Sequence, residues 1–328
     1  MSALPLYVGI DTGGSGTRAL LADGHGQILA AGRGGPSGIS ATAASRRQLQ
    51  RALATALAPI AKRIGSESCV VYAGIRGVSV PGRRETTVVE LQHRLPTARV
   101  HVSNDAVIAL NGALGERDGV AVLAGTGSIA MARSGDGREG RAGGYGYLIG
   151  DEGSAFWLGR AAVDACLRSL DGRDPPSSLA SLTLQAFDVR SATDVVARLY
   201  AGQPDQVQRL ANLAPLVTRC AGQGDDAAIA IVRLAARALA DLAAAAARQV
   251  WPGEIPDGLP VACCGGVWAA GQVLCEPFVT ALAERMPASR VSEPWLPPVA
   301  GAVLLAMRAD VGQVPPTVVD ALRSGLGL

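Results

Sequence analysis

A strand, a glycine-rich turn and a second strand follow one another twice in this chain, over residues 6–22 and 120–132. The two turns are Asp11-Thr12-Gly13-Gly14-Ser15-Gly16-Thr17 and Gly125-Thr126-Gly127-Ser128. Glycine amides are accessible because no side chain covers them, and a concave row of amides favours phosphate or another anion. This weak internal repeat predicts two related α/β halves, each of which contributes one phosphate loop to a shared cleft.

The first turn differs from the two common nucleotide-binding loops. A P-loop ends in a lysine and opens a helix, and the Rossmann fingerprint also requires a helix, whereas a strand follows here. Asp11 ends the strand that leads into the turn. A carboxylate beside a phosphate requires a cation between them, so Asp11 predicts Mg²⁺. An ordinary hairpin, with aspartate and threonine as turn residues, is the alternative.

Hydrophobic periodicity predicts alternating strands and helices, with mostly helices after residue 154. The expected strands are residues 6–10, 18–22, 27–31, 69–75, 99–102, 120–124, 126–132 and 259–264. The expected helices are residues 43–64, 83–94, 106–114, 155–170, 179–187, 192–200, 204–221, 225–250, 268–285 and 299–307, with a short terminal helix. Ser40 or Thr42 is the expected cap of the first helix.

Asp105 lies where a predicted strand gives way to a predicted helix. An aspartate in this position often caps the helix. The same position also fixes a carboxylate at the carboxyl end of a sheet, where α/β proteins bind ligands, and a carboxylate there can act as a general base. The sequence leaves both roles open, and one residue can serve both.

Residues 143–154 combine five glycines, two tyrosines and the carboxylate pair Asp151-Glu152, and an apolar helix follows. Glycine permits a close approach of the backbone to a ligand, and tyrosine offers a flat face and a hydroxyl. A flexible loop is the alternative. Gly265-Gly266-Val267, after the strand at 259–264, is a third place where backbone can meet a flat ligand.

Composition excludes several classes of protein. With 48% hydrophobic and 18% charged residues, the 328-residue chain is long and apolar enough for a sizeable core and about two domains. A net charge of +2 gives no reason to expect nucleic acid or an acidic membrane as a partner. No signal peptide or membrane span is visible, which predicts a cytoplasmic protein. The six cysteines have no metal-ligand spacing, so we expect buried free thiols.

Four segments resemble a known superfamily. Residues 9–17 resemble the first phosphate loop of the sugar kinases, actin and the heat-shock chaperone ATPases, and residues 125–130 resemble the second. Gly265-Gly266-Val267 resembles the adenosine-contacting turn. Residues 143–154 are similar to the N-acetylglucosamine kinase branch of the BadF/BadG/BcrA/BcrD ATPase family. The resemblance covers nearly the whole chain in order.

This resemblance implies an α/β fold of two ribonuclease H-like domains with an interdomain cleft, at residues 1–116 and 117–328, the second enriched in helices. The last helix is a candidate to pack back on the first domain. It also implies ATP, Mg²⁺ and an amino sugar as ligands, and a homodimer. Asp105 would be the base that takes the proton of the sugar 6-hydroxyl. The implied sugar contacts are Gly38, Asn104, Asp105, Ser128, Ile129, Gly144, Tyr145, Gly146, Tyr147 and Asp151. The implied nucleotide contacts are Asp11, Gly13, Gly14, Ser15, Thr17, Gly125, Thr126, Gly127, Gly265 and Gly266, with Asp11 also at the metal.

Two departures from the family pattern leave the sugar open. Gly38 and Ile129 stand where relatives carry asparagine, so glucosamine and N-acetylmuramic acid are alternatives to N-acetylglucosamine. Two other classes compete with a kinase. One is an ATP-driven activator, which holds an iron–sulfur cluster through reachable cysteines. The other is a sugar-binding regulator without catalysis, although both phosphate loops and Asp105 are intact here.

Overall fold

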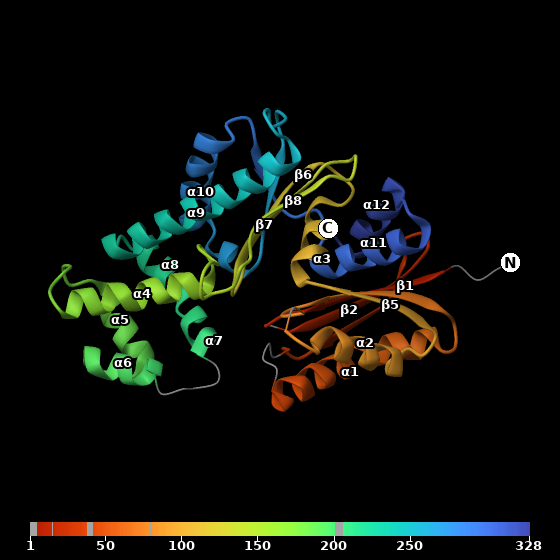
Figure 1. Ribbon diagram of the computed structural model, residues 1–328, viewed down its shortest axis with the longest axis horizontal. Coiled ribbons are helices and arrows are strands. Elements are labelled where there is room, and N and C mark those ends of the chain that lie inside the picture. The colour runs from red at the N-terminus through yellow and green to blue at the C-terminus, as the bar shows by residue number, and fades with distance from the viewer. Residues whose placement is uncertain (1–4, 15, 38–41, 79, 201–205) are drawn as a thin grey trace. The chain divides into compact units, whose positions relative to one another are not determined.

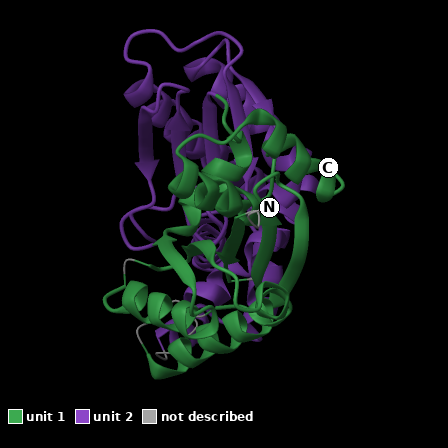
Figure 2. Cartoon of the chain, turned by 90° about the vertical axis from the view of Figure 1, so that its right-hand side faces the viewer, with its two compact units in different colours: residues 1–117, 294–328 green, residues 118–293 purple. Residues whose placement is uncertain are grey.

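The computed structural model describes residues 5–14, 16–37, 42–78, 80–200 and 206–328. The chain forms two compact units, shown in different colours in Figure 2. Unit 1 comprises residues 1–117 and 294–328, and unit 2 comprises residues 118–293. Each unit is built on a five-stranded mixed sheet, so the expected α/β fold class is confirmed. Residues 294–328, which the expected bounds placed in the second domain with the last helix as a candidate to pack on the first, belong to unit 1.

The sheet of unit 1 has the strand order β3-β2-β1-β4-β5. Its strands are β1 (Leu6–Thr12), β2 (Thr17–Asp23), β3 (Ile28–Gly34), β4 (Cys69–Ile75) and β5 (Ala98–Ser103). The first three strands are antiparallel neighbours, and β4 and β5 run parallel to β1. The carboxyl ends of β1, β4 and β5 therefore meet at one edge of the sheet.

Helices cover both faces of this sheet. They are α1 (Ala43–Ile64), α2 (Arg83–Arg94), α3 (Asp105–Leu114), α11 (Pro298–Val311) and α12 (Pro316–Gly325). Side chains alternate along β1, so Val8 and Ile10 face α1 while Tyr7 faces α11 and α12. In Figure 1, α1 and α2 lie on one side of the sheet and α11 and α12 on the other.

Glycines let α11 pack closely on its neighbours. A Cβ on Gly9 of β1 would lie 2.3 Å from the carbonyl oxygen of Val299. A Cβ on Gly301 would lie 2.1 Å from the carbonyl oxygen of Ile108 in α3. No side chain fits either space, so these contacts fix residues 294–328 to the first unit.

The sheet of unit 2 repeats the same topology, with the order β10-β9-β6-β7-β8. Its strands are β6 (Gly119–Ala124), β7 (Ser128–Arg133), β8 (Glu139–Gly143), β9 (Pro260–Cys264) and β10 (Arg290–Ser292). β6 corresponds to β1, because each is paired with an antiparallel strand on one side and a parallel strand on the other. The internal repeat read from the two glycine turns is therefore a repeat of the whole sheet.

Unit 2 is richer in helices, as expected. They are α4 (Ala155–Leu170), α5 (Ser178–Phe187), α6 (Ala192–Tyr200), α7 (Gln206–Ala211), α8 (Ala214–Gly222), α9 (Asp226–Val250), the 3₁₀ helix η1 (Gly266–Ala270) and α10 (Gln272–Arg285). The alanine-rich α9 packs on β7 and β8 and forms the centre of the unit 2 core. Among the described residues, no helix combines the length and the apolar character that a membrane span needs.

Two expected helices are broken. The helix expected at 204–221 is two helices in its described part, because Pro215 has no N–H to donate and begins a new helix, α8, at its first turn. The helix expected at 268–285 is interrupted at Gly271, whose φ of 60° ends η1 and caps α10. The strands β8 and β10 were not anticipated from the sequence.

Candidate active site

The first glycine turn closes the β1–β2 hairpin. Thr12 pairs with Thr17, and the N–H of Gly13 donates to the carbonyl of Gly16 at 2.9 Å. Gly13 and Gly14 lie in this turn, and Asp11 precedes it at the end of β1. Two expected contacts, Ser15 and Gly38, lie outside the described residues, as does the alternative cap Ser40. The other candidate, Thr42, caps α1 by accepting from the N–H of Ser45.

Two hydroxyls beside this turn are buried without a hydrogen-bond partner among the described residues. They belong to Thr17 and Ser37, which are 1% and 3% exposed. The N–H of Ser37 donates to the carbonyl of Gly13, which fixes Ser37 against the turn. An unpaired buried hydroxyl costs about 1–3 kcal/mol, so such groups commonly await a ligand or a water. Thr17 is one of the nucleotide contacts expected from the sequence. Nothing in the sequence distinguishes Ser37 as a site residue.

Asp105 is the first residue of α3, directly after the carboxyl end of β5. The residue that caps α3 is Asn104, whose side-chain oxygen accepts from the N–H of Ala106 at 2.8 Å. Of the two roles that the sequence left open for Asp105, that of the helix cap therefore belongs to its neighbour Asn104. Asn104, expected at the sugar, has its amide oxygen committed to the helix. The carboxylate of Asp105 interacts with backbone N–H groups at the same helix start and is not the cap.

The charge of Asp105 acts on Asp11 at this edge of the sheet. Burial and the charge of Asp105 raise the pKa of Asp11 to about 6, while Arg18 opposes the shift. Burial also raises the pKa of Asp105, against the opposing charge of Arg76 and backbone N–H groups. Perturbed carboxylates that gather at a sheet edge are typical of functional sites.

The donor set at this edge fits one magnesium ion. Mg²⁺ is usually held by one or two carboxylates together with substrate phosphates and water. Asp11 and Asp105 supply two carboxylates whose charges a dication would offset. Among the described residues there is no cluster of three or more His, Cys, Asp or Glu side chains suited to a metal, so this site would need the phosphates to complete it.

The second glycine turn is braced by α4. The N–H of Gly125 donates to the carbonyl of Gly127 at 2.9 Å, and the N–H of Ala155 donates to the carbonyl of Gly125 at 2.8 Å. Ser128, expected at the sugar, is buried, and its hydroxyl donates to the carbonyl of Glu152 at 2.7 Å. Thr126 and Ile129 are partly exposed on either side of it.

Residues 143–151 pass close to this turn. Gly144 and Gly146 have φ of 71° and 89°, and Asp151 has φ of 63°, which is uncommon outside glycine. A Cβ on Gly127 would lie 2.7 Å from a carboxylate oxygen of Asp151, so that carboxylate lies against the second glycine turn. Tyr145 is 70% exposed, and Tyr147 contacts the ring of Phe156. Strained residues of this kind are found at ligand sites.

Gly265 and Gly266 lie at the end of β9, next to the second turn. Gly265 has φ of 102°, and a Cβ there would lie 2.5 Å from the carbonyl oxygen of Ala124. A cavity of about 330 Å³ lies at the N-terminal end of α10 and is lined by Ile229, Arg233, Gln272, Val273 and Glu276, among others. These lining residues were not identified from the sequence. The one feature of the sequence that could have indicated them is Gly271, which ends η1 and allows α10 to begin at the cavity.

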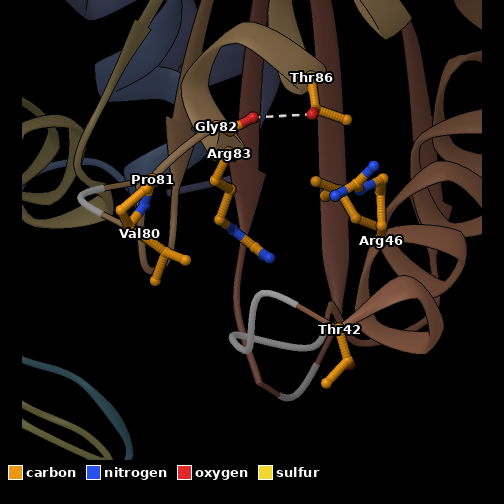
Figure 3. Close-up of a pocket in the computed structure, with 8 residues that line it drawn as sticks. Thr42, Arg46, Val80, Pro81, Gly82, Arg83 and Thr86 are labelled. Atoms are coloured by element: carbon orange, nitrogen blue, oxygen red, sulfur yellow. Dashed lines mark hydrogen bonds between the residues drawn. The ribbon is translucent and has the colours of Figure 1, made fainter.

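A second pocket, in unit 1, is too small for a substrate. It lies between the N-terminal ends of α1 and α2 and includes Thr42, Arg46 and Arg83, as Figure 3 shows. Its volume of about 20 Å³ has room for a water molecule only.

The six cysteines are all free, as expected. Four are buried, and Cys263 and Cys275 are partly exposed. Burial raises the pKa of Cys69 to about 11 and that of Cys264 to about 12, and burial with the nearby Cys275 raises that of Cys263. Cluster ligation requires thiolates, which these surroundings disfavour.

Unit 1 brings together Asp11, Thr17 and Asp105, and unit 2 brings together the second glycine turn, Asp151 and Gly265. Several known proteins that this chain resembles are named as sugar kinases. An N-acetylmuramic acid/N-acetylglucosamine kinase of Clostridium acetobutylicum is 31% identical over 236 residues, 71% of this chain and 76% of that protein. An N-acetyl-D-glucosamine kinase of Dictyostelium discoideum is 27% identical over 93% of this chain and 98% of its own length.

Solved structures agree with these relatives. The structure of a candidate N-acetylglucosamine kinase from Chromobacterium violaceum has a TM-score of 0.71 and 31% identity, and the match covers 92% of this chain and 99% of that chain. A glucokinase from Streptomyces griseus, at 21% identity and a TM-score of 0.53, shares the fold. Residues 8–306 match the BadF/BadG/BcrA/BcrD ATPase family as a whole. The chain therefore belongs to the BadF/BadG/BcrA/BcrD ATPase family, within the actin-like ATPase superfamily.

Proposed function

We propose that this protein is an ATP-dependent amino-sugar kinase that phosphorylates the 6-hydroxyl of N-acetylglucosamine or a close relative. The observation that carries the proposal is the pair Asp11 and Asp105, two carboxylates with raised pKa values beside a glycine turn in unit 1. A phosphate loop, a metal-binding carboxylate and a general base are the parts that phosphoryl transfer needs.

Each part has a proposed role. The amides of Gly13 and Gly14, with Ser15 and the hydroxyl of Thr17, bind phosphate oxygens, and Gly125, Thr126 and Gly127 do the same from unit 2. Gly265 and Gly266, with the cavity at the start of α10, bind the nucleoside, because a cavity of about 330 Å³ suits a small ligand. Asp11 holds Mg²⁺, which would offset the negative charge that develops on the phosphates.

Asp105 orients the sugar 6-hydroxyl and accepts its proton as the new O–P bond forms. The sugar hydroxyls donate to Asp151, and the segment 144–147 with Gly38, Asn104, Ser128 and Ile129 completes the sugar site. The raised pKa of Asp105 supports this role, because a base is most effective when its pKa approaches the working pH.

The preferred sugar is the open part of this proposal. The relatives named above act on N-acetylglucosamine and N-acetylmuramic acid, and a glucosamine kinase of Vibrio cholerae is 28% identical over 56% of this chain. Gly38 and Ile129 stand where relatives carry asparagine, and both positions would contact the sugar. We place N-acetylglucosamine first because it is common to two of the three relatives.

The test is ADP release with a panel of N-acetylglucosamine, glucosamine, N-acetylmuramic acid and glucose, followed by the mass and position of the phosphate on the product. We expect at least one amino sugar to be phosphorylated at O6. Release of ADP without any sugar would instead favour the ATP-driven activator. Iron bound to the purified protein would confirm that alternative. Sugar binding without ADP release would favour a regulator.

We also propose a cytoplasmic homodimer. Six free thiols, four of them buried, suit a reducing compartment. The mass of the protein in solution, measured by light scattering, tests the dimer.

A further inference from the structure

We propose that Arg76 is a catalytic residue whose guanidinium contacts the phosphoryl group while it passes from ATP to the sugar. This inference rests on the proposed kinase function and adds a residue that the sequence did not single out.

The register of the sheet brings Arg76 to the proposed base. β4 and β5 are parallel neighbours, with Gly74 opposite Ser103. Arg76 follows Gly74 by two residues and Asp105 follows Ser103 by two residues, so both leave the carboxyl edge of the sheet at the same level. The charge of Arg76 reaches Asp105, since it lowers the pKa of that carboxyl against the larger effect of burial.

Arg76 is also attached to the first phosphate loop. Its N–H donates to the carbonyl oxygen of Thr12 at 3.3 Å, and the hydroxyl of Thr12 lies at 3.4 Å from the same nitrogen. Thr12 is the last residue before the glycine turn. The backbone of Arg76 is therefore hydrogen-bonded to the residue that precedes the phosphate loop, and its side-chain charge acts on the carboxylate of Asp105.

Arg83 is also hydrogen-bonded to the backbone of Arg76. Its Nε donates to the carbonyl oxygen of Arg76 at 3.0 Å, and Arg83 is 6% exposed. Figure 3 shows Arg83 at the N-terminal end of α2. Burial and the charge of Arg76 lower the pKa of Arg83, so the two guanidinium groups are near one another. Two guanidinium groups near one another raise the local positive potential, which favours the binding of a phosphate group.

The chemistry suits an arginine in this position. During transfer, the sugar 6-oxygen forms a bond to phosphorus and loses its proton to Asp105. The bond from the γ-phosphorus to the β–γ bridging oxygen breaks, and ADP leaves with that electron pair. Negative charge spreads over the three remaining phosphoryl oxygens, and the planar guanidinium can donate to two of them while it stays protonated.

The test compares Arg76→Gln and Arg76→Lys with the wild type, with Arg63→Gln in an exposed part of α1 as the control. Thermal melting first establishes which variants fold. We expect Arg76→Gln to lower kcat by about a hundredfold or more with every sugar that the wild type uses, with the KM for sugar changed by less than about threefold. Arg76→Lys should recover part of kcat, and the control should match the wild type.

A second readout uses MgADP with aluminium fluoride, a mimic of the transferring phosphoryl group, in the presence of sugar. Arg76→Gln should weaken binding of this mimic in parallel with kcat and leave MgADP binding unchanged. Two results overturn the inference: an unchanged kcat, or a loss confined to N-acetylmuramic acid, which would assign Arg76 to the carboxylate of that sugar. A wild type that releases no ADP with any sugar would instead overturn the proposed function, before Arg76 is tested.

Discussion

Burial and the negative charge of Asp105 raise the pKa of Asp11 to about 6 at the carboxyl edge of the unit 1 sheet. The two carboxylates come from β1 and from the start of α3, elements that the chain separates by more than ninety residues. A fold selected for stability alone would not gather like charges in a poorly solvated place. The position of the two carboxylates is explained if they form a binding site for a cation, which the phosphates of the substrate would also ligate.

The first prediction concerns stability against pH. The pKa of Asp11 in the folded protein is about 6, above the ordinary value of 3.8, so its contribution to stability is favourable below about pH 4 and is lost as the pH rises through 6. Asp11→Asn removes this titration. We therefore expect the variant to be more stable than the wild type above pH 6, by about 1–3 kcal/mol, and equal to it near pH 4.

Thermal melting at several pH values, without nucleotide or Mg²⁺, measures this difference. Asp23→Asn is not a suitable control, because the Asp23 carboxylate accepts from the N–H groups of His25 and Gln27. Asp320→Asn, at an exposed position of α12, serves instead and should leave the pH profile unchanged. A wild type that is the more stable protein at pH 7 would contradict the repulsion between the two carboxylates.

The second prediction concerns magnesium. If Asp11 holds Mg²⁺, chelation by EDTA should abolish ADP release, and added Mg²⁺ should restore it. Asp11→Asn should raise the Mg²⁺ concentration needed for half-maximal rate by about tenfold or more, because one of the few protein ligands is lost. Turnover that continues undiminished in excess EDTA would remove the metal from the account.

The third prediction concerns the sugar. Asp151→Asn keeps the left-handed backbone, which asparagine tolerates, and removes only the negative charge. We expect the KM for the amino sugar to rise about 10- to 100-fold, which corresponds to the loss of charge-assisted hydrogen bonds. Asp188→Asn is a matched control. Asp188 also has a positive φ, of 53°, but it caps the C-terminal end of α5 and is not one of the proposed site residues. Equal KM values for the two variants would exclude Asp151 from the sugar site.

The fourth prediction concerns the packing of the last segment on unit 1. Gly301→Ala places a methyl group 2.1 Å from the carbonyl oxygen of Ile108 and 2.3 Å from the N–H nitrogen of Gly112. Backbone atoms cannot move aside cheaply, so we expect a loss of about 3 kcal/mol or more. Gly35→Ala, where a Cβ meets nothing within 4 Å, should cost little. A Gly301→Ala protein with wild-type melting would contradict the close contact of α11 with α3.

Much of the secondary structure was predictable because the chain alternates short apolar runs with glycine turns. The bounds of α1, α2, α4, α6 and β4 follow directly from periodicity and caps. The two glycine turns also indicated the repeat that the sheets confirm. Local patterns are informative here because each of these elements buries one continuous apolar face.

What the sequence could not give depends on contacts between distant residues. The packing of α11 against β1 and α3 depends on Gly9 and Gly301, whose importance appears only when their neighbours are known. The same holds for Ser37, a serine like many others until its hydroxyl is found buried beside Gly13. Arg76 became a candidate only through the register of β4 against β5. The sequence left the role of Asp105 open because Asn104 and Asp105 are both good caps, and only the geometry selects between them.

The most direct test of the account is ADP release by Asp105→Asn with N-acetylglucosamine or whichever amino sugar the wild type prefers. The variant keeps the size of the side chain, the cap Asn104 and the first phosphate loop. The account predicts that it folds, binds MgATP as the wild type does, and turns over at least about a hundredfold more slowly. Turnover near the wild-type rate would show that Asp105 is not the base and would contradict the central claim.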